Sequence, residues 1–148
     1  MKVSILIPVY NKSREIKDTI NTVYSHMKSL NKEFEVIIIN DGSTDNSLNI
    51  IKEKKKEFPN LIILENSINK GKGYSIRKGI LAASGDSILF LDADLAIPIQ
   101  EINKTINEIK EFNIVIGSRK IKGANIKHEE PWIREFSSKA FSFMVSSL

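Results

Sequence analysis

Short apolar runs alternate along the chain with segments in which apolar residues recur at helical spacing. The runs occupy residues 3–8, 34–39, 61–64, 87–91 and 114–117, a length typical of buried strands. Ile16, Ile20, Val23 and Met27 predict the first helix, with Ser13 as its N-cap. Further helices are expected up to about residue 58, over 73–83 and around 102–109. This order predicts an α/β protein with a doubly wound, mainly parallel sheet and helices on both faces.

Polar residues gather where the predicted strands end. In open parallel sheets, ligands bind beyond the carboxyl ends of the strands. A binding site is therefore expected at the edge that carries four segments: Pro8-Val9-Tyr10-Asn11, Asn40-Asp41-Gly42-Ser43, Asp92-Ala93-Asp94 and Gly117-Ser118-Arg119.

Asp92 and Asp94 directly follow the apolar run that ends at Leu91. Two carboxylates separated by one residue point to the same side of an extended backbone, where their oxygens suit a divalent cation. The alternative is a strand-end turn with solvated carboxylates. It is disfavoured because two like charges at the end of a buried strand repel each other when no cation lies between them. The pair predicts a metal site that binds a diphosphate.

Composition narrows the classes of function. The 148 residues fit one domain, and the absence of cysteine excludes disulfides, thiolate metal sites and cysteine nucleophiles. The net charge of +4 comes mainly from lysines on predicted helix faces, which favours solvated faces rather than a nucleic-acid partner. After residue 117 a local excess of Arg and Lys suits an anionic ligand or a membrane surface. No apolar run reaches the ~20 residues of a membrane span.

Together these segments resemble the inverting nucleotide-sugar glycosyltransferases of the GT-A fold. The resemblance is strongest to the polyprenyl-phosphate branch, which contains the dolichyl-phosphate glucose and mannose synthases. The matching stretches also include Asn69-Lys70-Gly71-Lys72-Gly73 and Gly85-Asp86, and they follow the family's order. Each motif alone is weak, but several in order at strand ends are specific. The amino acids at residues 69–73 are more similar to those of the dolichyl-phosphate glucosyltransferases than to those of the mannosyl synthases. Ala96 occupies a position where the mannosyl synthases usually have glutamine.

The resemblance implies a nucleotide site. Asp41 would accept the ring N–H of uracil or guanine, although Asp41 and Ser43 could instead form an Asx turn and cap a helix. Gly71 and Arg77 would approach the nucleotide, but a plain turn glycine and a solvated helix charge remain open alternatives. The cradle would be completed by Pro8, Tyr10, Asn11 and Ser43.

The resemblance also implies a catalytic metal and an acceptor site. Mg²⁺ or Mn²⁺ would bridge Asp92 and Asp94 to the diphosphate. Arg119, Arg134 and Ser138 would hold the acceptor phosphate, and Arg134 and Ser138 share one face of a predicted helix. The opposite face of that helix is apolar, which suits either a membrane interface or ordinary core packing.

The expected function is transfer of a hexose, glucose from UDP-glucose, to a polyprenyl phosphate, with inversion, at the cytoplasmic face of a membrane. An ionised phosphate acceptor needs no general base, and the sequence offers no clear candidate for one. Two alternatives remain open: a hydroxyl-directed glycosyltransferase of surface polysaccharide synthesis, and a catalytically silent nucleotide-sugar-binding module. Residues 1–148 are expected to form one catalytic domain, truncated at its C-terminus because the chain ends inside a helical pattern.

Overall fold

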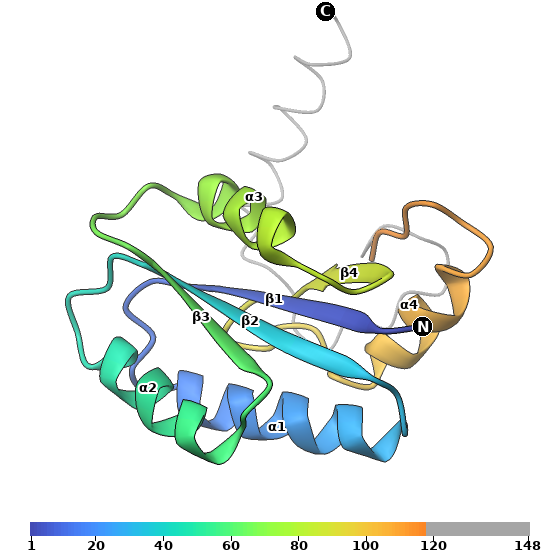
Figure 1. Ribbon diagram of the computed structural model, residues 1–148, viewed down its shortest axis with the longest axis horizontal. Helices are drawn as coiled ribbons and strands as arrows, with labels where there is room; N and C mark the ends of the chain where they lie inside the picture. Colours follow the sequence, from blue (N-terminus) through green and yellow to red (C-terminus); the bar gives the residue numbers. More distant parts are fainter. Residues whose placement is uncertain (118–148) are drawn as a thin grey trace, which may run out of the picture. The chain divides into compact units, whose positions relative to one another are not determined.

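Four parallel strands form the sheet in the computed structural model, which describes residues 1–117 (Figure 1). Their order across the sheet is β3-β2-β1-β4. Strands β2 and β3 therefore lie on one side of β1, and β4 pairs with its other side. This topology confirms the predicted parallel α/β fold. The strands are β1 (Val3–Val9), β2 (Phe34–Asp41), β3 (Leu61–Asn66) and β4 (Ser87–Phe90).

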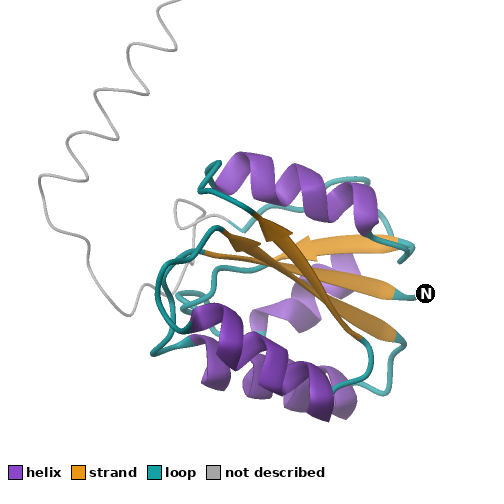
Figure 2. Cartoon of the chain, turned by 60° about the vertical axis from the view of Figure 1, so that its left-hand side comes forward, coloured by secondary structure: helices purple, strands orange, loops and turns teal. Residues whose placement is uncertain are grey.

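Helices cover both faces of this sheet (Figure 2). One face packs against residues of α1 (Ile16–Ser29), α2 (Ser47–Glu57) and α4 (Glu101–Glu108), which share one apolar core. The other face carries α3 (Lys72–Ala82), which packs on β1 and β2. The sheet belongs to the compact unit Met1–Asn113; of the second unit, Ile114–Leu148, only residues 114–117 are described.

Strand β1 shows why the central runs are apolar throughout. Ile5 and Ile7 point to the core beneath α1, whereas Leu6 points to the α3 face, and all three are fully buried. On that face the helix comes close because Gly79 has no side chain. A Cβ there would lie 2.9 Å from Ile39 and 3.2 Å from Leu6. Burial on both faces removes the polar alternation that a half-exposed strand would show.

Three local expectations were wrong. Residues 114–117 form no strand, and Ile114 is 77% exposed; a short apolar run becomes a strand only where a neighbour takes its hydrogen bonds. Ser13 is not an N-cap, because α1 is preceded by Glu15 and the Ser13 amide donates to Asp45. Strand β4 is not buried on both faces, since Phe90 on the α3 side is 55% exposed.

A buried carboxylate joins β1 and β2 to the loop before β4. Glu35 accepts hydrogen bonds from the Ser4 hydroxyl (2.6 Å) and from the backbone N–H (2.7 Å) and hydroxyl (2.9 Å) of Ser84. Lys2 forms an ion pair with it at 3.0 Å. Burial alone would raise the pKa of Glu35, but these partners outweigh it and lower the pKa from 4.5 to about 2.

Candidate active site

A pocket of about 300 Å³ lies at the carboxyl edge of the sheet, within the size range of small-molecule sites. It brings together residues from the ends of β1, β2 and β4 and from the start of α3. Six predicted site residues line it: Pro8, Tyr10, Asp41, Gly71, Asp92 and Asp94. Its other lining residues are Val9, Lys12, Asn69, Lys72 and Ala93.

Asn11 and Ser43 connect the two loops beside this pocket instead of lining it. The Asn11 side-chain oxygen accepts from the backbone N–H groups of Thr44 (2.9 Å) and Asp45 (3.3 Å). The Asn11 N–H donates to the Ser43 hydroxyl at 3.0 Å, and the Lys12 N–H donates to Ser47 at 2.8 Å. Asn11 adopts a φ of +50°, which asparagine tolerates better than most residues. These contacts fix the loop that carries Tyr10 and Lys12.

Asp41 is 3% exposed and holds the backbone directly before α3 through hydrogen bonds. One carboxylate oxygen accepts from the Asn66 amide (2.7 Å) and the Lys70 N–H (2.9 Å), and the other accepts from the Gly71 N–H at 2.8 Å. Burial raises its pKa, but the hydrogen bonds outweigh this effect and hold the pKa below the ordinary value of 3.8. These partners lie far along the chain, so the carboxylate does not form the local Asx turn considered as an alternative. The Ser75 hydroxyl also contributes to the lowered pKa, so most acceptor positions of this carboxylate are used within the protein.

The two aspartates lie on a turn, not on an extended strand. Strand β4 ends at Phe90, and the Leu95 N–H donates to the Asp92 carbonyl at 3.1 Å. Leu95 has a φ of +47°, a conformation that only a well-determined turn imposes on leucine. The Ala93 carbonyl accepts a 2.6 Å bond from the Thr19 hydroxyl of α1. This bond anchors the turn to α1. Although the backbone is not extended here, Asp92 and Asp94 both line the pocket.

Two lysines at the pocket were not identified from the sequence. Lys12 Nζ lies 3.6 Å from a carboxylate oxygen of Asp94, and Lys72 forms an ion pair with Asp92. Lys12 follows the β1 loop, and Lys72 is the first residue of α3. Lys72 belongs to the matching stretch at residues 69–73 and Lys12 directly follows Asn11, but neither was assigned a role, because lysine is common on solvated helix faces.

The carboxylate pair fits a divalent cation with few protein ligands. Within residues 1–117, no group of three or more His, Asp or Glu side chains is arranged to hold a metal. Asp92 and Asp94 would supply two hard oxygen ligands, which leaves the other positions for diphosphate oxygens and water. Mg²⁺ commonly binds in this way, through one or two carboxylates plus substrate phosphates. The residues present therefore fit the expected Mg²⁺ or Mn²⁺.

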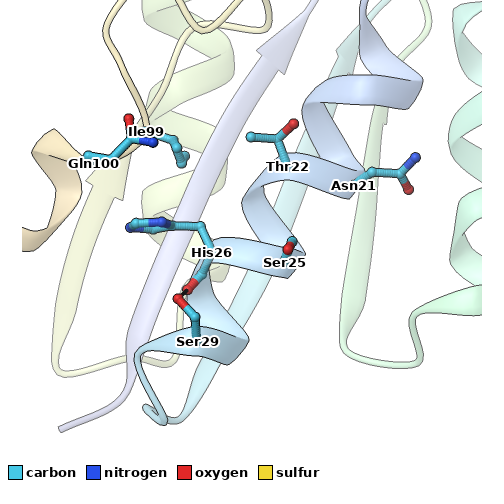
Figure 3. A pocket seen from close by; sticks show the side chains of 7 residues that line it. All are labelled: Asn21, Thr22, Ser25, His26, Ser29, Ile99 and Gln100. Carbon is cyan, nitrogen blue, oxygen red and sulfur yellow. Dashed lines mark hydrogen bonds between the residues drawn. The ribbon is translucent and has the colours of Figure 1, made fainter.

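Other predicted residues do not join the pocket. Arg77 is exposed on α3 and does not line it. Arg119, Arg134 and Ser138 lie outside the described residues. A second pocket of about 480 Å³ lies beside α1 and contains none of the predicted site residues (Figure 3). Its lining residues are Asn21, Thr22, Ser25, His26, Ser29, Ile99 and Gln100.

Comparison with known families decides where this chain belongs. The model of glycosyl transferase family 2 matches residues 4–145, nearly the whole sequence. The chain belongs to glycosyl transferase family 2. Within this family, its motifs are those of the polyprenyl-phosphate branch with the GT-A fold, as the sequence predicted.

Two curated relatives have names that fit this branch. A dolichyl-phosphate beta-glucosyltransferase of Trichomonas vaginalis is 32% identical over 91% of this chain and 44% of its own length. An undecaprenyl-phosphate 4-deoxy-4-formamido-L-arabinose transferase of Proteus mirabilis is also 32% identical, over 98% of this chain and 43% of its own length. The chain therefore spans less than half the length of these family 2 relatives.

Solved structures support the same fold. S. aureus TarS, solved in complex with UDP-GlcNAc, has a TM-score of 0.65 at 28% identity over 86% of this chain and 37% of its own. A Pyrobaculum calidifontis mannosyltransferase, solved with GDP-Man and Mn²⁺, has a TM-score of 0.55 over 65% of this chain and 32% of its own. Its 21% identity supports the fold alone. Within residues 1–117 of this chain, no helix is long and apolar enough to cross a membrane.

Proposed function

We propose that this family 2 chain contributes the donor site of an enzyme that transfers a hexose from a nucleotide sugar to a polyprenyl phosphate. The donor is UDP-glucose, the product is inverted at the anomeric carbon, and the enzyme is peripheral to the cytoplasmic face of a membrane. The curated relatives support the acceptor class, because both are named for polyprenyl-phosphate transfer.

The observation that carries the proposal is the convergence of Asp92 and Asp94 on the pocket that Tyr10 and Asp41 also line. A nucleoside diphosphate has three parts that need different chemistry: a base, a ribose and two phosphates. The Asp41 carboxylate, which lines the pocket, would accept an imide N–H of the base, and Tyr10, 45% exposed, offers an aromatic surface. The aspartates face the position expected for the diphosphate.

The reaction moves one glycosyl group. A phosphate oxygen of the acceptor forms a bond to the anomeric carbon from the face opposite the donor diphosphate. The bond from that carbon to the diphosphate oxygen breaks, and the departing nucleoside diphosphate keeps the electron pair. A divalent cation supplies charge neutralisation for this leaving group. Asp92 and Asp94 would hold this cation, while Asp41 and Tyr10 would orient the nucleoside.

The proposal assigns acceptor binding to Arg119, Arg134 and Ser138. Arginine suits phosphate because its guanidinium donates two parallel hydrogen bonds. These residues lie outside the described part of the chain, so their role rests on the family motif alone. An ionised phosphate acceptor would need no general base at neutral pH.

The test begins with donor binding to the 148-residue chain. Affinities for UDP and GDP are measured by calorimetry with Mn²⁺ and with EDTA. We expect UDP to bind more tightly than GDP and to require the cation, because a cation held by Asp92 and Asp94 would supply the positive charge that the diphosphate needs at this edge of the pocket. Asp94→Asn should weaken cation-dependent binding, while Glu101→Gln, an exposed carboxylate on α4, serves as the control.

Transfer is then measured on a version extended to the length of the curated relatives, with a short polyprenyl phosphate and with a free sugar as acceptors. Asp94→Asn should reduce transfer by about a hundredfold or more, the usual scale for losing one preorganised electrostatic group. Arg134→Ala should reduce transfer to the lipid phosphate while leaving UDP binding unchanged. Equal UDP affinity with Mn²⁺ and EDTA contradicts the donor site. Transfer to the sugar hydroxyl alone supports the polysaccharide alternative.

A further inference from the structure

Each of the two site carboxylates is paired with its own lysine. Lys12 lies 3.6 Å from Asp94, and Lys72 contacts Asp92. The two lysines come from different elements, yet all four side chains line the same pocket. The result is a compact group with two negative and two positive charges. A divalent cation that takes the carboxylate oxygens now paired with the lysines would displace both ammonium groups.

The backbone positions of these lysines are fixed by buried contacts. The Lys12 N–H donates to Ser47, whose side chain is fully buried. Lys72 follows Gly71, whose N–H is held by the buried Asp41. The side chains themselves are exposed enough to move, with relative exposures of 33% for Lys12 and 54% for Lys72. Fixed backbones with flexible four-carbon stems allow each ammonium group to exchange partners within the pocket.

We propose that Lys12 and Lys72 exchange partners when the donor binds. In the free protein they neutralise Asp94 and Asp92; in the loaded protein the cation takes the carboxylates and the two ammonium groups bind oxygens of the donor diphosphate. This inference rests on the proposed function, because it requires a nucleoside diphosphate in the pocket. It adds two diphosphate-binding residues that also determine how tightly the free site holds a cation.

Charge balance favours this exchange over two unrelated surface ion pairs. A cation on two carboxylates gives a locally neutral group, and the released lysines add two positive charges beside the diphosphate. Without the exchange, the negative diphosphate would meet only the cation. The Lys72 side chain is 54% exposed, and its Nζ also lies 5.9 Å from the centre of the Phe90 ring, so it would keep contact with solvent and with this ring after leaving Asp92.

The exchange predicts effects of opposite sign on two affinities. Lys12→Met and Lys72→Met keep the apolar stem and remove the charge. Each should strengthen binding of Mn²⁺ alone, by about two- to fivefold, because a competing cation is gone. Each should weaken binding of UDP in saturating Mn²⁺, by about ten- to a hundredfold, because a charge-assisted phosphate contact is lost. Electron paramagnetic resonance measures the first affinity, and calorimetry measures the second.

Lys52→Met is the matched control. Lys52 pairs with Glu65 at 3.2 Å and is 53% exposed, much like Lys72, but it lies outside the pocket. It should change neither affinity. A second control tests the pairing itself: in an Asp92→Asn background, Lys72→Met should no longer strengthen Mn²⁺ binding.

The outcomes separate this inference from the proposed function. If the unaltered chain does not bind UDP with Mn²⁺, the proposed function and the exchange both fail. If UDP binds and both lysine variants bind it as tightly as the unaltered chain, the exchange alone is wrong. Weakened binding of both Mn²⁺ and UDP would show that the lysines only support the structure of the pocket, and would also overturn the exchange.

Discussion

Gly42 shows how one residue permits a close approach of two backbone segments beside the pocket. It follows Asp41 and has a φ of +68°, a conformation that favours glycine. A Cβ there would lie 2.5 Å from the Ile68 carbonyl carbon and 2.6 Å from the Asn69 nitrogen. Both atoms belong to backbone, which cannot swing aside as a side chain can. Because Asn69 lines the pocket, crowding at Gly42 is transmitted directly to the site.

We therefore expect Gly42→Ala to lower the free energy of unfolding by more than about 1 kcal/mol and to weaken UDP binding. Gly73→Ala is the matched control, since no atom lies within 4 Å of the position that a Cβ would take there, in the first turn of α3. That change should raise stability by up to about 1 kcal/mol. Denaturant unfolding and calorimetry measure the two effects. A Gly42→Ala protein as stable as the unaltered chain would contradict the close approach of these backbone atoms.

At this scale the sequence predicted residue types better than residue roles. Asp92 and Asp94 were recognisable because paired carboxylates after an apolar run have few other uses. Asn11 and Asp41 were also identified as site residues, but the bonds that Asn11 accepts from Thr44 and that Asp41 accepts from Gly71 depend on contacts about 30 residues away. Lys12 and Lys72 could not be distinguished from solvated lysines, because their importance comes only from the carboxylates that folding places beside them.

Among the elements, the loop between α3 and β4 depends on the ionisation of Glu35. Its pKa is lowered from 4.5 to about 2, so the ionised form stabilises the fold. This contribution is fully present above about pH 4.5 and is lost as the pH falls through about 2, where the folded protein takes up the proton. Acid should therefore weaken the attachment of Ser84 to the sheet.

Glu35→Gln isolates this contribution. At pH 7 the variant should be less stable, because an amide places N–H groups opposite the donors of Ser4 and Ser84. Between pH 4.5 and 2 its stability should fall less steeply than that of the unaltered chain, since one linked proton is missing. Unfolding free energies across this range measure the difference. Glu33→Gln, at an exposed position, should follow the unaltered chain, and an identical slope for Glu35→Gln would contradict the assignment.

The elements themselves were largely predictable from periodicity. The first four strands and the helices were found near their observed positions because short apolar runs alternate with segments of helical periodicity. The strand at 114–117 was not, because four apolar residues do not specify a partner. The N-cap at Ser13 failed for a related reason: its amide is used by Asp45 of another loop, so tertiary contact overrode a local signal.

At the scale of the whole molecule, the strand order was not contained in the local pattern. Alternating strands and helices predict a parallel sheet, but they do not determine that β4 pairs with β1 after two strands have been added on the other side. The local pattern also does not determine that one face of β4 is exposed. Phe90 looks like a core residue in sequence, yet within the described residues nothing covers more than part of it. Burial there is a property of the assembled molecule and not of the strand.

The long-range pairing of β4 should determine when the site is completed during folding. Its start is joined to the start of β1 by contacts between residues 84 positions apart, such as the bond from the Lys2 N–H to Asp86. The β1–β2 pairing closes a much shorter loop, and closing a longer loop costs more entropy. The β1–β4 contacts should consequently form last and open first. Hydrogen exchange checks this order: the Leu91 amide, bonded to the Leu6 carbonyl, should exchange faster than β2 amides, and equal rates would contradict it. The nucleoside half of the pocket would then exist in partly folded molecules, whereas cation binding, which needs the turn after β4, would report only those that have finished folding.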